Sequence, residues 1–445
     1  MITASGLGHA VMNGVNDAIN RVDAFGGMQG RPDGSKGTNF LLVGTDRRDG
    51  LDPAAKQRYH LGGAPCRCTD TIMLVHLSQD RQRASVVSVP RDTYVRLPGA
   101  APAGSGRPTA AATHPAKINE AYADGGPKLT VRTVEQLTGV HIDHYLEVDF
   151  VSFMKTVDVI GGVQVCTTVP LQDSYTGLDL PVGTTTLSGG QALQYVRSRH
   201  LDGAADLGRM QRQQRFLAQV IHRITSGSTL HDPVALSRIA TTALGSVRAD
   251  HGLRTTDLIA LARGMKGFSP SSSEFVSVPL SEVNHAVPGV GSTVKWDDRK
   301  AGRLWASIRA DRPLTVRKKH ARGGKVEVDP SQIRVRVANG TLTNGLAATA
   351  QKQLGDTGFV TPGLPVTADH RTDRTEIRFD PRWDRSVRSL AAALPGAALV
   401  PVPGLGPVMD VTLGSDFTKV TPVTGAASGS VAGEPAVTGD QVACA

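Results

Sequence analysis

The stretch with the greatest potential for chemistry begins at Arg197 and ends at Arg212, and it holds four arginines and two aspartates. Arg197 and Arg199 alternate with smaller residues, so in a strand they would share one face. A helix is predicted to begin near Asp206, a residue type that caps helices well. Such arginines can converge on phosphate oxygens, because the planar guanidinium binds them in pairs and stays charged. Ordinary solvated surface arginines are the alternative.

The apolar stripe of the predicted helix helps to decide between these readings. It has helical spacing and consists of Phe216, Leu217, Val220, Ile221 and Ile224. Arg209 lies seven residues before Phe216, so it projects from the same side as the stripe, and Arg212 lies at the stripe's edge. A solvated charge run would lie opposite the stripe, so the pattern favours arginines that point inward.

Two aspartates and a further arginine mark the ends of three predicted strands. Asp46 follows an apolar run over 38–44, Asp70 begins the next strand, and Arg91 follows a strand over 84–90. If consecutive strands pair antiparallel, all three residues lie at one end of the sheet. Carboxylate oxygens suit Mg²⁺ or Mn²⁺, with substrate phosphates as the other ligands. Each aspartate alone would more commonly cap local backbone in a turn.

The elements that must position these residues alternate between strand and helix. After the first three strands, the pattern predicts a helix over 127–138, a strand over 142–148, a helix over 150–160, a strand over 163–167, and a short helix capped by Ser188 that leads into the Arg197 strand. This alternation favours an α/β fold with helices on both faces of a mixed central sheet. The helices over 150–160 and 214–224 are candidates to line an apolar channel, although amphipathic stripes more commonly pack a core.

The rest of the chain divides by composition. Residues 226–315 are expected to be helical with polar breaks, including helices over 233–244, 256–266 and 296–309, and a strand over 275–279. A second, small α/β module is predicted from strands and helices at 332–338, 344–355, 374–379, 384–394 and 408–413. The expected organisation is a juxtamembrane stub or linker over 1–37, a catalytic domain over 38–315, a linker over 316–330, the small domain over 331–420, and a disordered tail over 421–445.

Composition narrows the class of partner. The chain has 445 residues, a net charge of +9 and a pI near 9.5, which suit a polyanion such as nucleic acid, an anionic membrane surface or a phosphorylated substrate. No nucleic-acid-binding module is recognisable, which argues against nucleic acid. No apolar run reaches the roughly 20 residues that span a membrane, and no signal peptide is evident.

Four cysteines, Cys66, Cys68, Cys166 and Cys444, permit three full pairings, among which the sequence cannot choose. Cys66 and Cys68 are too close for an easy mutual bridge. Disulfides would indicate an oxidising, exported location, and zinc with help from His60 is the competing interpretation.

Several motifs, in order along residues 38–225, resemble the LytR–CpsA–Psr family. They are Asn39-Phe-Leu-Leu-Val-Gly-Thr-Asp-Arg-Arg, Thr69-Asp-Thr-Ile-Met-Leu-Val-His, Ser88-Val-Pro-Arg-Asp, Lys117-Ile-Asn-Glu-Ala-Tyr, Asp158-Val-Ile-Gly-Gly-Val, Leu187-Ser-Gly-Gly-Gln-Ala-Leu-Gln-Tyr-Val-Arg-Ser-Arg, and Asp206-Leu-Gly-Arg-Met-Gln-Arg-Gln-Gln. Residues 332–415 resemble the LytR C-terminal domain that follows in many actinobacterial members.

The resemblance implies an α-β-α sandwich and an extracytoplasmic, membrane-anchored transferase. Such an enzyme takes a glycopolymer, of the teichoic acid or arabinogalactan kind, from a polyprenyl-pyrophosphate carrier and attaches it to peptidoglycan. The family's metal-binding aspartates correspond to Asp46 and Asp70, and its motif aspartate, with a supporting or proton-accepting role, to Asp206. Its pyrophosphate-binding arginines correspond to Arg91, Arg197, Arg199, Arg209 and Arg212, with Arg48 as a further candidate. Two features depart from the pattern: Cys68 stands where many members carry arginine, and the family's N-terminal membrane helix is missing from this chain.

The expected mechanism is attack by a sugar hydroxyl of peptidoglycan on the phosphorus next to the polymer, with the metal and the arginines neutralising the pyrophosphate. Two alternatives stay open. One is a metal-dependent polyprenyl-pyrophosphate phosphatase that uses water as acceptor. The other is a non-catalytic wall-polymer-binding or regulatory protein, which would not depend on Asp46 and Asp70.

Overall fold

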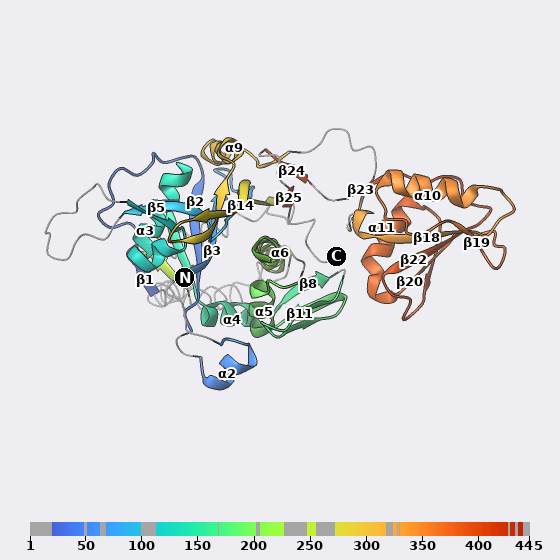
Figure 1. Cartoon of the computed structure of the whole chain (residues 1–445), viewed down its shortest axis with the longest axis horizontal. Coiled ribbons are helices and arrows are strands. Elements are labelled where there is room, and N and C mark those ends of the chain that lie inside the picture. The colour runs from blue at the N-terminus through green and yellow to red at the C-terminus, as the bar shows by residue number, and fades with distance from the viewer. Residues whose placement is uncertain are drawn as a thin grey trace, which may run out of the picture.

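The computed structural model describes residues 20–48, 51–62, 68–98, 113–167, 169–201, 205–226, 247–254, 272–316, 324–326, 328, 330–425, 428–431 and 435–438. These residues form two units, each with its own sheet and its own hydrophobic core (Figure 1). The predicted helices over 233–244 and 256–266 lie outside the described residues.

A ten-stranded mixed sheet forms the centre of the large unit. The strand order is β1-β12-β7-β2-β3-β4-β13-β25-β24-β16. Its central strand β2 (Thr38–Thr45) pairs antiparallel with β3 (Thr69–Leu77) and parallel with β7 (His144–Val148). Beyond β3 lie β4 (Ala84–Val89) and the parallel β13 (Ser273–Ser277). β2 and β4 are mostly buried, as their near-continuous apolar runs predicted.

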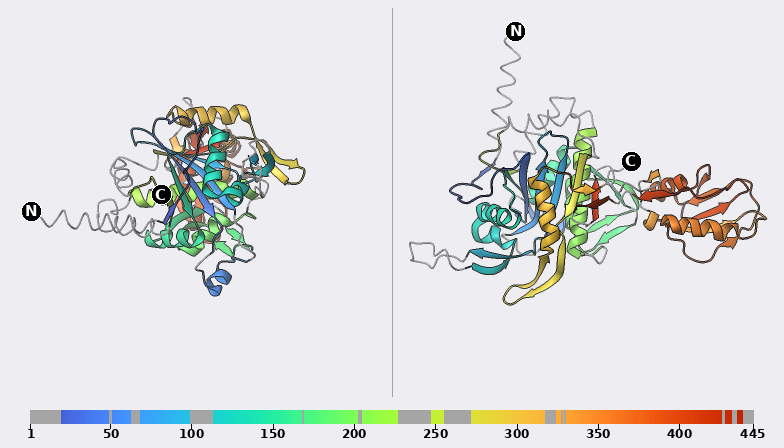
Figure 2. Two further views of the ribbon diagram at one scale, coloured as in Figure 1. Left: turned by 90° about the vertical axis from the view of Figure 1, so that its left-hand side faces the viewer. Right: turned by 90° about the horizontal axis from the view of Figure 1, so that it is seen from above.

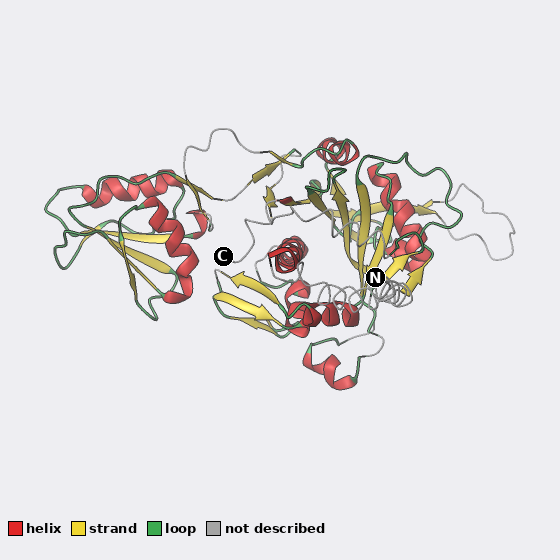
Figure 3. Cartoon of the chain, turned by 180° about the vertical axis from the view of Figure 1, so that it is seen from behind, coloured by secondary structure: helices red, strands yellow, loops and turns green. Residues whose placement is uncertain are grey.

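Helices cover both faces of this sheet (Figure 3). On one face, α3 (Glu120–Thr138) and α9 (Asp298–Arg309) pack in one core with the sheet residues Leu41, Val43, Ile72 and Leu74. On the other face, α6 (Ala205–Ser226) packs against the alternate positions Met73 and Val86. α4 (Phe150–Val159) and α5 (Gly189–Arg197) lie beside α6. The predicted α-β-α sandwich around a mixed sheet is confirmed.

The predicted strand through Arg197 and Arg199 is wrong. Arg197 is the last residue of α5, and irregular backbone follows from Ser198. The predicted cap is present, with the Ser188 N–H donating to Gln191 Oε1 at 3.1 Å. Arg197 belongs to the final turn of a helix whose buried face includes Ala192, Leu193 and Tyr195, and Arg199 lies two residues beyond the helix end.

The sequence patterns did not predict several antiparallel strand pairs. They are β5 (Tyr94–Pro98) with β6 (Thr113–Lys117), β9 (Leu171–Asp173) with β10 (Leu178–Leu180), β8 (Val163–Thr167) with β11 (Gly183–Leu187), and β14 (Leu280–Val287) with β15 (Gly291–Trp296). Figure 2 shows the last hairpin, in yellow, projecting from the large unit. It lies in a segment expected to be helical, and most of β14 is exposed, so its strands lack the alternating burial that identifies a strand from sequence.

Both ends of the described chain contribute strands to the large sheet. The sequence had predicted a stub or linker over 1–37 and a disordered tail over 421–445 in their place. β1 (Asn20–Val22) pairs parallel with β12 (Arg248–Asp250). β24 (Ser428–Ser430) pairs with β16 (Thr315–Val316), and β25 (Pro435–Thr438) pairs with β13. Strand pairing gives these polar or glycine-rich segments backbone partners that no local pattern reveals.

The C-terminal unit is the predicted small α/β module. Its sheet has the order β19-β18-β22-β20-β21 and carries two helices. The elements are β18 (Arg334–Asn339), α10 (Leu346–Thr357), β19 (Val366–Thr367), β20 (Glu376–Phe379), α11 (Asp384–Ala393), β21 (Ala398–Pro401) and β22 (Val408–Leu413). The short strands β17 (Gly324–Val326) and β23 (Val423–Gly425) pair beside it.

Cys68 and Cys166 are both disulfide-bonded, which confirms the disulfide interpretation for these two residues. A disulfide sulfur is no thiolate ligand. No group of three potential metal-binding side chains occurs in the described part of the chain. The zinc alternative is therefore excluded for Cys68 and Cys166.

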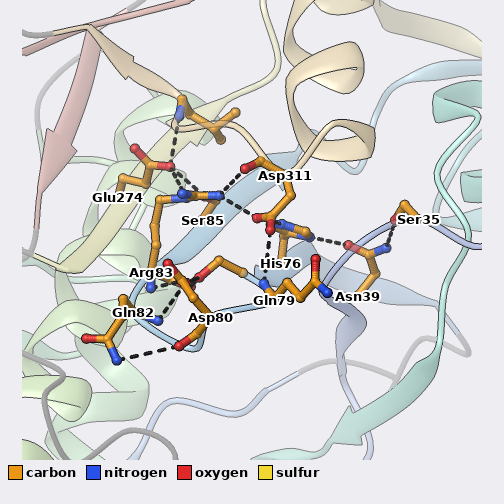
Figure 4. Close-up of polar contacts among 12 residues, drawn as sticks. Ser35, Asn39, His76, Gln79, Asp80, Gln82, Arg83, Ser85, Glu274 and Asp311 are labelled. Carbon is orange, nitrogen blue, oxygen red and sulfur yellow. Dashed lines mark hydrogen bonds and ion pairs between the residues drawn. The ribbon is translucent and has the colours of Figure 1, made fainter.

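A buried polar network holds the loop after α9 against the sheet (Figure 4). His76 lies between Asn39 Oδ1, 2.7 Å from its Nδ1, and Asp311 Oδ1, 3.0 Å from its Nε2. Arg83 donates to Asp311 at 2.6 Å and approaches Glu274 at 3.5 Å. Burial lowers the pKa of His76, although Asp311 acts in the opposite direction. The network lies at the sheet end where β2 begins and β3 ends.

Replacing Asp311 by alanine should destabilise the large unit, because Arg83 and His76 would lose the carboxylate that they share. We expect a loss of about 2–4 kcal/mol in the free energy of unfolding. Urea denaturation followed by tryptophan fluorescence measures it, since Trp296 and Trp305 lie in this unit's core. Glu282→Ala is the control: it removes an exposed ion pair in the same unit and should cost less than about 0.5 kcal/mol. Equal losses in both variants would contradict the assignment.

Candidate functional site

Strand register brings the three predicted strand-end residues together. In the antiparallel pairs, Gly44 lies opposite Thr71 and Ile72 lies opposite Val89. Asp46 after β2, Asp70 at the start of β3, and Arg91 after β4 therefore share one end of the sheet, as predicted.

Asp46 is held by its near neighbour Arg48. Arg48 donates from Nε and Nη2 to the two carboxylate oxygens, both at 2.6 Å. Its Nη1 also donates to the carbonyls of Leu61 and Gly62, each at 2.9 Å, in the loop after α2 (Pro53–Arg58). Arg48 thus links Asp46 to the loop that borders the site, and Asp46 itself is buried, with 7% exposure.

Asp70 connects two arginines from different parts of the chain. Arg91 Nη1 forms a short ion pair with Asp70 Oδ1. Arg209 reaches from α6, with Nη1 4.0 Å from the same oxygen and Nη2 3.4 Å from the Asp70 carbonyl. The expectation that Arg209 points inward is confirmed, since the residue is only 5% exposed.

Asp206, in the first turn of α6, lies among three arginines. Its Oδ2 accepts from Arg209 Nη2 at 2.8 Å and lies 3.6 Å from Arg91 Nε, while Arg199 Nε lies 3.0 Å from Oδ1. Residues from β3, β4, the segment after α5 and α6 therefore form one charged group at this end of the sheet.

Arg197 and Arg212 are held mainly by backbone and ring contacts. Arg197 Cζ lies 5.2 Å from the centroid of the Phe150 ring, a cation–π geometry, and Nη1 donates to the Tyr59 carbonyl at 3.3 Å. Burial lowers the pKa of Arg197. Arg212, which is buried, donates from Nη2 to the Ser198 carbonyl at 2.5 Å and so supports the segment that carries Arg199.

The charge balance of the site favours an anion. The predicted residues comprise six arginines (48, 91, 197, 199, 209, 212) and three aspartates (46, 70, 206), an excess of three positive charges. Burial lowers the pKa of Arg209, although Asp206 opposes this effect. Nε of Arg91, Arg199 and Arg209 makes no hydrogen bond of good geometry among the described residues, although the Nε atoms of Arg91 and Arg199 lie 3.6 Å and 3.0 Å from the Asp206 carboxylate. These donors are not fully satisfied and positive charge is in excess, so an anion with several oxygens would be stabilised here.

A cavity of about 380 Å³ extends from the charged group between α4, α6 and the sheet. Asp70, Arg91, Arg197, Arg199 and Arg209 form its charged part. The remaining lining is mostly apolar and includes Leu42, Met73, Phe150, Phe153, Val157, Ile160, Leu193, Phe216, Leu217 and Val220, while Thr45, Thr71, Asp149, Thr156 and Gln213 are its polar members. The predicted lining helices over 150–160 and 214–224 are thus confirmed as walls of a cavity.

Comparison with known proteins identifies the family. The sequence model of the LytR_cpsA_psr family matches residues 10–307. The chain belongs to this family. Residues 332–417 match the model described as LytR cell envelope-related transcriptional attenuator.

Relatives in the LytR–CpsA–Psr family carry names from cell-wall biosynthesis. The probable cell wall biosynthesis protein LcpB of Corynebacterium glutamicum is 34% identical over 65% of this chain and 65% of its own length. LcpA of the same organism, a cell wall biosynthesis protein, is 26% identical over 98% of this chain and 88% of its own length. The crystal structure of Bacillus subtilis TagV is 26% identical over 63% of this chain and 100% of that chain, with a TM-score of 0.49.

The donor set at the sheet end fits a hard divalent cation in part. Mg²⁺ is commonly held by one or two carboxylates together with water and substrate phosphates, so Asp46 and Asp70 are a sufficient protein contribution. Both oxygens of Asp46 accept from Arg48, and Asp70 pairs with Arg91. A cation would therefore have to replace these guanidinium groups on the carboxylates.

Sequence reasoning missed the residue that fixes the Arg199 backbone. Asp173, at the end of β9, accepts at Oδ2 from the N–H groups of Arg199 at 3.0 Å and His200 at 3.3 Å. Although burial acts to raise it, these backbone donors lower the pKa of the Asp173 carboxyl. The sequence offered only an aspartate before a turn, which is a common local pattern.

Inorganic pyrophosphate should raise the melting temperature of the full chain, because it would meet several arginines that carry an excess of positive charge and incompletely satisfied donors. At a hundredfold excess over its dissociation constant, the stabilisation is about 2.7 kcal/mol. Differential scanning fluorimetry measures the shift, and Arg199→Ala should reduce it. Arg336→Ala, which alters an exposed ion pair of the C-terminal unit, should keep the full shift. If Arg199→Ala shows the same shift in melting temperature as the wild type, Arg199 does not bind the pyrophosphate.

Proposed function

We propose that this protein transfers a glycopolymer from a polyprenyl-pyrophosphate carrier to peptidoglycan, forming a phosphodiester. The observation that carries the proposal is a single cavity with an apolar length and a strongly cationic end. A substrate that matches both parts must combine a long hydrocarbon with a compact polyanion. A prenyl chain on a pyrophosphate has this combination. Bacillus subtilis TagU, 32% identical over 42% of this chain and 51% of its own length, is named a polyisoprenyl-teichoic acid–peptidoglycan teichoic acid transferase.

The apolar walls would bind the lipid by the hydrophobic effect. Each methylene group removed from water contributes about 0.8 kcal/mol, so even part of a prenyl chain gives substantial affinity. The lipid's direction is then fixed, because the pyrophosphate belongs at the end where Arg91, Arg199 and Arg209 meet.

The arginines supply the electrostatic part of catalysis. A sugar hydroxyl of the acceptor attacks the phosphorus next to the glycopolymer, the bond from that phosphorus to the bridging oxygen breaks, and polyprenyl phosphate leaves. Arg91, Arg199 and Arg209 neutralise charge on the phosphoryl oxygens, which matters most where water is excluded. Asp206 orients these arginines. In this proposal its carboxylate would accept the proton of the attacking hydroxyl.

Magnesium or manganese is part of the proposal. Asp46 and Asp70 would hold the ion, which supplies additional positive charge against the pyrophosphate oxygens. Arg48 would then leave Asp46 and join the phosphate-binding arginines.

The proposed substrate places the reaction at the outer surface of the cell membrane, where lipid carrier and peptidoglycan meet. In the described part of the chain, no helix is both long and apolar enough to cross a membrane. Docking to the membrane surface would align the apolar cavity with the carrier lipid, and the net charge of +9 favours anionic headgroups.

Alanine at Arg91 or Arg199 should lower transfer by about a hundredfold to a thousandfold in kcat, because each removes a donor to the developing phosphoryl charge. The assay follows joining of a radiolabelled lipid-linked glycan to peptidoglycan oligosaccharide in the presence of Mg²⁺. Arg336→Ala serves as the control and should turn over normally. Near-normal transfer by both active-site variants would refute the assignment, and release of the glycan at equal rates without acceptor would favour the phosphatase.

Filling the cavity should affect long carriers more than short ones. Thr156, on α4, lines the cavity and is half-buried, so Thr156→Trp should exclude part of a long prenyl chain. Loss of contact with only two methylene groups would raise KM for a long-chain donor about tenfold. Lys155→Trp, one residue away on the exposed face of α4, is the matched control. Comparing KM for long-chain and three-isoprene donors tests this, and equal effects on both would contradict lipid binding in the cavity.

A further inference from the structure

An exposed aromatic pair lies directly beside the arginine segment. Tyr175 is 71% exposed, the side chain of His200 is 54% exposed, and the two rings stack with centroids 4.1 Å apart and an interplanar angle of 27°. Tyr175 belongs to the turn between β9 and β10, and His200 directly follows Arg199. Neither residue is among those that line the cavity, whereas Arg199 is.

The pair is held firmly although its rings are exposed. The buried carboxylate of Asp173 accepts from the N–H of Tyr175 at 3.0 Å through Oδ1, and from the N–H groups of Arg199 and His200 through Oδ2. His200 Nδ1 also lies 3.5 Å from Asp173 Oδ1. One carboxylate therefore fixes the backbone of Tyr175, of His200 and of the cavity-lining Arg199 in a single arrangement, and it also lies beside the His200 ring.

A second contact ties the same two segments together. The hydroxyl groups of Thr176 and Ser198 lie 2.8 Å apart, and Ser198 donates to the Gln194 carbonyl at 2.9 Å. Both hydroxyls are buried, so this contact lies beneath the exposed rings. The rings contribute little to the core, yet the structure beneath them prevents their separation from Arg199. Rigid aromatic surface at low entropic cost is a feature of ligand-binding positions.

We propose that Tyr175 and His200 form a platform on which a sugar ring of the substrate stacks. The inference rests on the proposed function, in which the pyrophosphate at Arg199 carries a glycan that must leave the lipid cavity. The face of an aromatic ring is electron-rich and apolar, so it attracts the C–H face of a pyranose or furanose while the sugar hydroxyls stay in water. The sugar belongs either to the donor glycan next to the pyrophosphate or to the acceptor glycan that approaches it.

Binding of two lipids to the full chain tests the platform: a polyprenyl pyrophosphate that bears a disaccharide, and the same lipid without sugar. Tyr175→Ala should weaken binding of the disaccharide lipid by about threefold to tenfold and leave the sugar-free lipid unchanged, if the sugar is the donor's. Tyr175→Phe keeps the ring and should bind both lipids like the wild type. A merely structural role for Tyr175 would affect the two lipids equally.

Transfer kinetics with a peptidoglycan oligosaccharide form the second arm. If the stacked sugar is the acceptor's, Tyr175→Ala raises KM for the oligosaccharide by about threefold to tenfold, Tyr175→Phe restores it, and donor binding stays unchanged. Unchanged donor affinity together with unchanged acceptor KM in Tyr175→Ala overturns the platform while wild-type transfer leaves the proposed function in place. A wild-type chain that binds neither lipid removes the proposed function, and the platform with it.

Discussion

The structure of the site depends on holding several guanidinium groups close together against their mutual repulsion. Arg91, Arg199 and Arg209 converge on one small region, where burial disfavours the charged form of Arg209. Asp206 lies 2.8–3.6 Å from all three, and Asp70 pairs with two of them. The aspartates lower the repulsion enough to keep the arginines in place, yet positive charge remains in excess. The folded protein is therefore prepared for an anion before any anion binds, which is the condition for electrostatic preorganisation.

This arrangement requires contributions from distant parts of the sequence. The register of β2, β3 and β4 sets the positions of Asp46, Asp70 and Arg91, and α6 must cross the same sheet end to supply Arg209. Packing of Ala218 and Leu217 on the sheet fixes α6 there. Gly189 allows α5 to approach α4 closely, since a Cβ there would lie 2.3 Å from the Met154 carbonyl oxygen. Gly190 leaves room for Tyr59 at the end of α2, since a Cβ there would lie 1.9 Å from the Tyr59 ring. The same hydrophobic contacts that stabilise the fold therefore aim the charged groups.

The sequence predicted those parts of the site whose geometry depends on residues close together in the chain. A short polar turn makes antiparallel pairing of β3 and β4 a strong expectation, so Asp70 and Arg91 could be brought together without coordinates. The spacing of Arg209 from Phe216 likewise follows from helix geometry alone. Arg197 was assigned to a strand because two alternating residues cannot distinguish a strand from the last turn of a helix. Asp173 and the strand β25 were missed because their partners, the Arg199 segment and β13, are distant in sequence and leave no periodic signal.

The path of the chain restrains the position of the C-terminal unit, and the composition of the sequence did not predict this restraint. The chain leaves the large sheet after β16, forms the small unit, and returns as β24, which pairs with β16, and β25, which pairs with β13. Ala436 of β25 is buried in the same core as Leu304 and Trp305 of α9. The small unit is therefore connected to the large sheet at two points rather than one. A unit connected twice cannot rotate freely about a single linker, so its position is coupled to the sheet that carries the arginine site.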